Sequence, residues 1–197
     1  VILDLTLSDG SGMDFLIEMK QRDPKLPVLI LSAHPEDQFA IRVLRAAGVP
    51  FAPRTYRYEE RGGTGVAARE LGVDEHACVK TLVFEDDGGR PFVVLMHGDR
   101  EVSTRMLARA LDVRSVQPCA PETAERHSGY RVGGTSPLGT RKGLPVYMER
   151  TIADLPRLLV NGGRRGFLLE MAPADLQRVL QPVLVEVGID PADRDRG

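Results

Sequence analysis

The stretch CVKTLVFEDDGGRPFVVLMH, residues 78–97, decides the fold and has the pattern of a β-hairpin. Residues 78–85 and 91–97 are rich in β-branched and other apolar side chains, which favours strands. Between them lies DDGG, residues 86–89, whose residue types are those that tight hairpin turns prefer. We therefore predict two antiparallel strands joined by a short turn.

Outward from this hairpin, helix and strand patterns follow one another without regular alternation. Thr64 and Ser103 are suited to cap helices, and Pro121 and Pro173 are suited to begin them. The predicted helices cover residues 36–47, 64–71, 103–111, a short segment from 121, and 173–180. The predicted strands cover residues 54–59, 130–133, 145–149, 158–160, 167–170 and 183–187. This order predicts an α+β fold, a mixed sheet or partial barrel with surrounding helices.

The first 39 residues have a different, α/β pattern. Two apolar runs, residues 1–5 and 27–32, flank a segment with helical spacing at 13–21, which predicts an incomplete β-α-β unit. Two strands are too few to form an independent sheet. The predicted parts are the fragment 1–39, a main domain over 40–188 and a polar tail over 189–197.

Composition narrows the possible functions. No apolar run approaches the roughly 18 residues that cross a membrane, and the start of the chain lacks the basic region of a signal peptide. The spacing of Cys78 and Cys119 suits neither a disulfide framework nor a zinc site, and the histidines lack metal-ligand spacing. We expect a cytoplasmic protein with no metal or other cofactor. Because the net charge is −2, binding to nucleic acid would need a local basic patch.

Lys80 is the first candidate functional residue. Side chains alternate along a strand, so Lys80 shares a face with Leu82 and Phe84. A lysine on an apolar face is costly unless it has a partner or a task. The alternative is a lysine whose stem lies on the apolar surface while its ammonium reaches water.

Two glycine-rich segments are the next candidates. The backbone N–H groups of GYRVGGTSPLG, residues 129–139, could hold an oxyanion or a phosphate, although an ordinary turn has the same composition. The segment NGGRRG, residues 161–166, adds two cations suited to phosphate, or to a solvated turn. Arg164 and Arg165, with Arg141 and Lys142, form the densest positive clusters near these segments.

These segments together resemble the YbaK/ProX family of aminoacyl-tRNA editing domains. VKTL at 79–82, SGYRVGGTSPLG at 128–139 and GGRRG at 162–166 follow the order and approximate spacing of that family. The resemblance covers residues 40–188. The family includes bacterial Cys-tRNA(Pro) deacylase and resembles the editing domain of bacterial prolyl-tRNA synthetase. It implies an editing-domain fold and aminoacyl-tRNA as a partner, with prolyl-tRNA synthetase as a second candidate partner.

The resemblance also implies the site and the reaction. Lys80 is implied as the essential lysine, and Gly133, Gly134, Thr135 and Ser136 as the wall that meets the aminoacyl carbonyl. The implied substrate-binding residues are Tyr56, Thr81, Asn161, Gly162, Gly163, Arg164 and Arg165; Asn161 departs from the serine that the family pattern favours. The implied enzyme, a hydrolase or lyase, cleaves the ester of a small mischarged amino acid, foremost cysteine on tRNA(Pro). The attacking group would be the thiol of a cysteinyl substrate or a water molecule.

Residues 1–39 resemble part of a response-regulator receiver domain. Asp4 stands where that family has its phospho-acceptor, and Ser32 where it has its switch hydroxyl, but Ser8 replaces the usual proline. The acidic pair that would bind magnesium has no counterpart, which argues against phosphorylation of Asp4. The alternatives to a deacylase are thus a phosphorylatable signalling protein and a non-catalytic editing-fold protein that binds tRNA or a synthetase.

Overall fold

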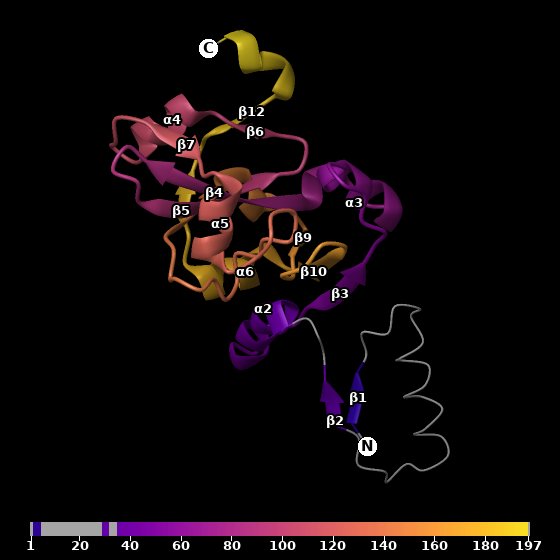
Figure 1. The fold of residues 1–197 in the computed structure, drawn as a ribbon. Helices are drawn as coiled ribbons and strands as arrows, with labels where there is room; N and C mark the ends of the chain where they lie inside the picture. Colours follow the sequence, from indigo (N-terminus) through magenta and orange to yellow (C-terminus); the bar gives the residue numbers. More distant parts are fainter. Residues whose placement is uncertain (1, 5–28, 32–34, 197) are drawn as a thin grey trace. The chain divides into compact units, whose positions relative to one another are not determined.

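The computed structural model describes residues 2–4, 29–31 and 35–196, which belong to two compact units, Val1–Pro35 and Glu36–Gly197 (Figure 1). In the first unit, β1 (Ile2–Asp4) and β2 (Leu29–Leu31) pair in parallel, with Ile2 opposite Leu29. A β-α-β order predicts this parallel pairing. The helix expected over 13–21, with Ser8 and Ser32, lies outside the described residues.

We expect deletion of residues 1–35 to leave the melting temperature of the second unit nearly unchanged. The hydrophobic clusters of that unit are built from residue 40 onward, and two short strands cannot form a stable sheet. Calorimetry of the full and shortened chains measures the difference. A drop of roughly 10 °C, equivalent to a few kcal/mol in a domain of this size, would contradict the expectation.

The second unit is built on an eight-stranded mixed sheet. Its strands follow the order β11 (Val183–Val185), β8 (Val146–Glu149), β5 (Pro91–His97), β4 (Cys78–Asp86), β9 (Leu158–Asn161), β10 (Phe167–Met171) and β3 (Ala52–Thr55), and β7 (Val116–Pro118) also pairs with β4. The predicted hairpin is confirmed, because β4 and β5 are antiparallel with Lys80 opposite Met96. β4–β9, β5–β8 and β8–β11 are parallel pairs. Among the described strands, β11 and β3 are the edges, so the sheet is open and not a barrel.

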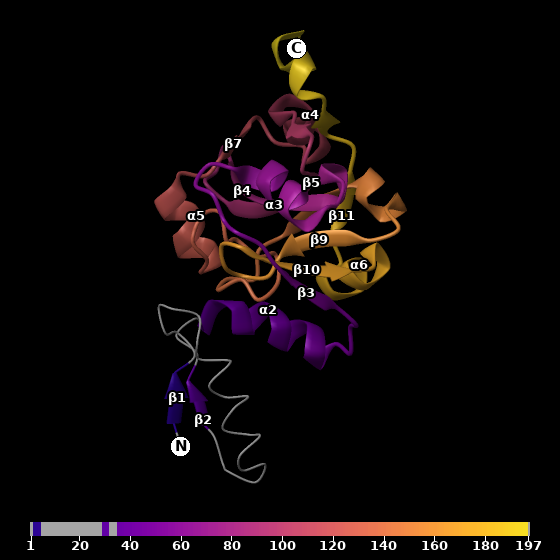
Figure 2. The ribbon, with the colours of Figure 1, turned by 90° about the vertical axis from the view of Figure 1, so that its right-hand side faces the viewer.

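Helices cover both faces of this sheet. On one face, Ala40 and Leu44 of α2 (Pro35–Ala46) and Leu176 of α6 (Pro173–Leu180) pack with strand residues such as Leu95. On the other face, α4 (Thr104–Ala110) packs over β5 and α3 (Gly63–Leu71) over β9 and β10; Figure 2 shows α3 in front of the sheet. The remaining elements are α5 (Pro121–Ser128), the pair β6 (Glu101–Val102) and β12 (Gly188–Ile189), and the 3₁₀ helices Glu75–Ala77, Arg150–Asp154 and Pro191–Arg196. None of the described helices is long and apolar enough to cross a membrane.

The strand expected over residues 130–133 does not form. Residues 129–145 connect α5 to β8 without regular structure, and we call residues 129–139 the glycine loop. Gly129 and Gly133 have φ values of +82° and +85°, which a strand does not permit. Tyr130 is buried, and its hydroxyl donates to the Leu138 carbonyl at 2.6 Å, which closes the loop on itself.

Two other boundaries differ from the sequence predictions. The strand expected at 54–59 is β3, which ends at Thr55; because it lies at the sheet edge, it accommodates Pro53. α3 begins at Gly63 after Gly62, so Thr64 is not its cap. The predicted Ser103 cap is confirmed, since its hydroxyl accepts from the Met106 N–H.

Candidate functional site

Lys80 faces the side of the sheet that α3 covers. Parallel strands β4 and β9 place Val79 opposite Val160, so the next residues along, Lys80 and Asn161, lie side by side. Their side chains point to the same face, because alternation takes Val79 and Val160 to the other face, where both pack in the α2–α6 core. We call this side, with residues Cys78, Lys80, Leu159, Asn161 and Leu168, the α3 face.

The Lys80 ammonium is held by two backbone carbonyls. It donates to the Gly98 oxygen at 2.9 Å and to the Arg100 oxygen at 2.5 Å, both in the turn that follows β5. An ammonium has three N–H donors. The two carbonyls use two of these donors, and the carboxylates of Glu101, Glu75 and Asp99 lie near enough to act on the ammonium.

A small polar network surrounds the Gly98 carbonyl. The Thr64 hydroxyl donates to Glu75 Oε1 at 2.7 Å and lies 3.2 Å from the Gly98 oxygen. A Cβ at Gly98 would be 2.9 Å from the Cys78 carbonyl oxygen and would crowd the Glu75 backbone, so the turn needs glycine. Sequence analysis missed Thr64, Glu75 and Gly98 as functional candidates, because their contacts join segments that are distant in the sequence.

Burial and nearby carboxylates act in opposite directions on Lys80. Burial lowers the pKa of the Lys80 ammonium below its ordinary value of 10.5, because desolvation disfavours the charged form. The carboxylates of Glu101, Glu75 and Asp99 oppose this shift. The lysine is thus a partly desolvated cation, which interacts more strongly with a ligand's negative charge than a solvated one.

The glycine loop meets the β9–β10 turn at Asn161. The Asn161 amide Nδ2 donates to the Gly133 carbonyl at 3.3 Å, and its Oδ1 accepts from the Gly163 N–H at 2.8 Å. The glycine loop also packs tightly on the β9–β10 turn at Gly134. A Cβ added to Gly134 would lie 2.9 Å from the Arg165 backbone nitrogen and 3.0 Å from Arg164 backbone carbons. Asn161 therefore fixes the loop beside Lys80.

Arg164 and Arg165 are both engaged with neighbouring residues. The Arg165 guanidinium lies 5.2 Å from the Tyr58 ring centroid, and its Nε donates to the Val132 carbonyl at 3.0 Å. The Arg164 guanidinium lies 4.8 Å from the Phe167 ring centroid. These contacts link the β9–β10 turn to the glycine loop and to the segment after β3. Sequence analysis missed Tyr58.

The backbone N–H groups of residues 133–136, which are predicted to meet the aminoacyl carbonyl, are not equally free to bind a ligand. The Gly134 N–H is used within the loop, since it donates to the Arg131 carbonyl at 2.8 Å. Among the described residues no acceptor is recorded for those of Gly133, Thr135 and Ser136. Ser136 is fully buried, whereas Thr135 is 9% exposed and Gly133 is exposed. Gly133 and Thr135 retain some exposure, so their N–H groups are the candidate donors.

Tyr56 and Thr81 lie on opposite faces of the sheet. Tyr56 packs beside Leu159 and Leu168 on the α3 face, and burial raises the pKa of its phenol, which stays protonated. Thr81 faces the α2–α6 core opposite Leu95, and its buried hydroxyl has no partner among the described residues. The structure thus places Tyr56 on the face of Lys80 and Asn161, and separates Thr81 from them.

Comparisons with known proteins agree with this geometry. The family model described as "Aminoacyl-tRNA editing domain" matches residues 62–179. EbsC of Enterococcus faecalis, assigned as a Cys-tRNA(Pro)/Cys-tRNA(Cys) deacylase, is 28% identical over 135 residues, which is 68% of this chain and 82% of EbsC. Proline–tRNA ligase of Geobacillus kaustophilus is 27% identical over 51% of this chain, but the match spans only 18% of the ligase.

A solved structure shares the fold. It is described as a trans-editing enzyme for prolyl-tRNA synthetase and has a TM-score of 0.69 at 20% identity, covering 79% of this chain and 98% of its own. The mixed sheet and flanking helices are therefore an editing-domain fold. The chain belongs to the aminoacyl-tRNA editing domain family, because the family model covers more than half of it. The receiver-like interpretation of residues 1–39, with phosphorylation of Asp4, stays a prediction.

Proposed function

We propose that this protein is a trans-editing deacylase that removes a mischarged small amino acid from tRNA, with cysteine on tRNA(Pro) as the leading substrate. The observation that carries the proposal is the partly desolvated Lys80 ammonium, which comes from the same sheet face as Asn161, the residue that holds the glycine loop. Family membership supports the editing role, and the name of EbsC suggests the substrate. Both cysteines are free thiols, which suits a cytoplasmic location.

The proposed reaction cleaves the ester between the amino acid and the terminal ribose of tRNA. Attack on the ester carbonyl gives a tetrahedral oxyanion, and backbone donors aimed at such a charge lower the barrier. The N–H groups of Gly133 and Thr135 are suited to this role. Lys80 would hold the terminal phosphate or ribose, or would assist the carbonyl, through its positive charge. Tyr56, just after β3, would line the site beside Leu159 and Leu168.

The chain's own thiols are poor nucleophiles. Burial raises the pKa of Cys78 and of Cys119 to about 11, so both are protonated at neutral pH. The attacking group is then water, which makes the enzyme a hydrolase, or the thiol of a cysteinyl substrate. In the second case sulfur bonds to the carbonyl carbon while the ribose oxygen leaves with the thiol's proton, and no water is consumed.

A deacylation panel tests the proposal directly. The full chain is incubated with tRNA(Pro) charged with cysteine, alanine or serine, and the remaining ester is measured over time. We expect the fastest cleavage for cysteine. Cleavage of alanyl or seryl esters would support water as the attacking group. Absence of cleavage on all three would overturn the deacylase and favour the non-catalytic, tRNA-binding or synthetase-binding alternative.

The enzyme's rate is expected to fall at alkaline pH. The protonated form of Lys80 is the one proposed to act, and burial lowers its pKa, so the loss should begin at a lower pH than for an ordinary lysine. Spontaneous ester hydrolysis changes in the opposite direction, since it rises with hydroxide. Rapid-mixing rates corrected for the uncatalysed reaction give the profile. A corrected rate that keeps rising beyond pH 10.5, the ordinary pKa of lysine, would exclude a required Lys80 ammonium.

A further inference from the structure

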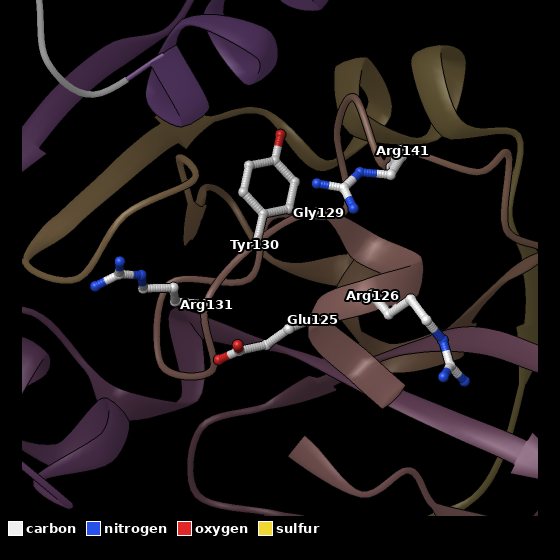
Figure 3. A pocket seen from close by; sticks show the side chains of 6 residues that line it. All are labelled: Glu125, Arg126, Gly129, Tyr130, Arg131 and Arg141. Atoms are coloured by element: carbon white, nitrogen blue, oxygen red, sulfur yellow. The ribbon is translucent and has the colours of Figure 1, made fainter. Parts of the chain in front are cut away.

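A shallow depression lies between α5 and the two ends of the glycine loop. Its volume is about 280 Å³, and it is lined by Glu125, Arg126, Gly129, Tyr130, Arg131 and Arg141. Figure 3 shows the side chains of Arg126 on α5, Arg131 in the loop and Arg141 just after it, with Arg126 and Arg131 pointing outward in different directions. Tyr130 is buried beneath them and hydrogen bonds to the Leu138 carbonyl, so the floor is rigid.

The charge around this depression is net positive, because three arginines and one carboxylate, that of Glu125, line it. Arg126, Arg131 and Arg141 are exposed, and no ion pair is recorded for them among the residues that the structure describes. The one acidic lining residue, Glu125, uses its Oε1 to accept from the Val132 N–H at 3.0 Å. Lys142 follows Arg141 directly and is also exposed. Arg165, by contrast, is held by Val132 and Tyr58.

The position of these cations is fixed relative to the candidate site. Arg131 precedes Gly133 by two residues, and Arg141 follows Gly139 by two. The Arg141 N–H donates to the Ser128 carbonyl at 2.9 Å, which ties the two ends of the loop together. A polymer whose end lies at Gly133 and Thr135 can therefore continue directly across the arginines.

We propose that Arg126, Arg131 and Arg141 form a binding surface for the backbone phosphates of the tRNA's 3′ arm. The inference rests on the proposed deacylase function, and it assigns backbone binding to these cations rather than to Arg164 and Arg165. A chain of net charge −2 needs such a local patch to attract RNA. Arginine forks suit phosphate oxygens, and exposed cations suit sequence-independent contact with the backbone.

The test is the salt dependence of binding to an uncharged tRNA transcript, which needs no catalysis. Wild-type protein is compared with the double variant Arg131→Gln, Arg141→Gln. The matched control is Arg105→Gln, Arg109→Gln, which removes the same charge from exposed positions on α4. Two lost phosphate contacts to a single strand should reduce the slope of log K against log salt by about 1.4. Between 50 and 200 mM salt this is an about sevenfold difference in salt sensitivity.

A single variant guards against misfolding of the double variant. Arg126→Gln changes only the exposed side of α5 and should reduce the slope by about 0.7, with an unchanged thermal melt. Three results would contradict the proposed binding surface. They are no binding of the transcript by the wild type, the same slope in the double variant Arg131→Gln, Arg141→Gln as in the wild type, and a reduction of the slope by the α4 control as large as that by the double variant. A loop pair that weakens binding to poly-aspartate but not to tRNA would also overturn it, in favour of an acidic protein partner. The transcript carries no aminoacyl ester, so the binding experiment does not depend on catalysis. The proposed binding surface can therefore be tested even if the deacylation panel shows no cleavage.

Discussion

Replacing Lys80 with alanine is expected to lower the rate of aminoacyl-ester cleavage by a factor on the order of 100 or more, the usual effect of removing one electrostatic donor from a transition state. The fold should survive, because the side chain contacts two carbonyls in a part-buried turn rather than filling a core. A loss of about 1 kcal/mol would lower the melting temperature by about 2–4 °C in a domain of this size. Single-turnover cleavage of Cys-tRNA(Pro) alongside a thermal melt measures both.

Two further substitutions sharpen this experiment. Lys80→Arg keeps the charge, but its planar fork cannot reproduce a compact ammonium held between the Gly98 and Arg100 carbonyls. We expect it to fail nearly as alanine does; partial rescue would mean that positive charge is sufficient. Thr81→Val changes the next residue on the same strand but on the opposite face, and it should leave the rate close to that of wild type. Wild-type rates in Lys80→Ala with an unaltered melt would remove Lys80 from the site.

The elements predicted correctly are those whose signal is local. The hairpin at 78–97 has two long apolar runs and a turn of Asp and Gly, and each feature acts within a few residues. Ser103 caps α4 because its hydroxyl needs only an N–H three residues away. Strand alternation likewise sufficed to place Lys80 on the face that it occupies.

The features that were missed depend on contacts between distant segments. The glycine loop was expected to contain a strand, yet Tyr130 hydrogen bonds within the loop instead of extending a ladder. The partners of Lys80 are backbone carbonyls 18 and 20 residues away. Every residue has a backbone carbonyl, so the pattern of side chains cannot predict which carbonyl will accept a hydrogen bond. Arg165 looked like an available phosphate ligand, but its contacts with Tyr58 and Val132 appear only once three segments come together.

Substituting alanine for Gly134 is expected to impair both activity and stability. The added Cβ would lie within 3.0 Å of the backbone of Arg164 and Arg165, and backbone cannot move aside as a flexible side chain can. The glycine loop must then withdraw from the β9–β10 turn, which weakens the Asn161–Gly133 hydrogen bond and shifts the N–H groups of Gly133 and Thr135. Overpacking of this kind costs typically about 1–3 kcal/mol, and a displacement of about 1 Å can cost roughly 100-fold in rate.

Gly143→Ala is the matched control for Gly134→Ala. It makes the same chemical change in the same α5–β8 connection, residues 129–145, but a Cβ added at Gly143 has no neighbouring atom within 4 Å. We expect Gly143→Ala to keep the wild-type rate and melt, while Gly134→Ala loses at least tenfold in single-turnover rate and melts several degrees lower. If both variants cleaved Cys-tRNA(Pro) at the wild-type rate, close packing of the glycine loop on the β9–β10 turn would not be needed. Oxyanion stabilisation would then have to come from donors outside the loop. A loss of activity in Gly134→Ala without any change in melt would be the stronger outcome, because it would show that the position of the loop matters for the reaction itself.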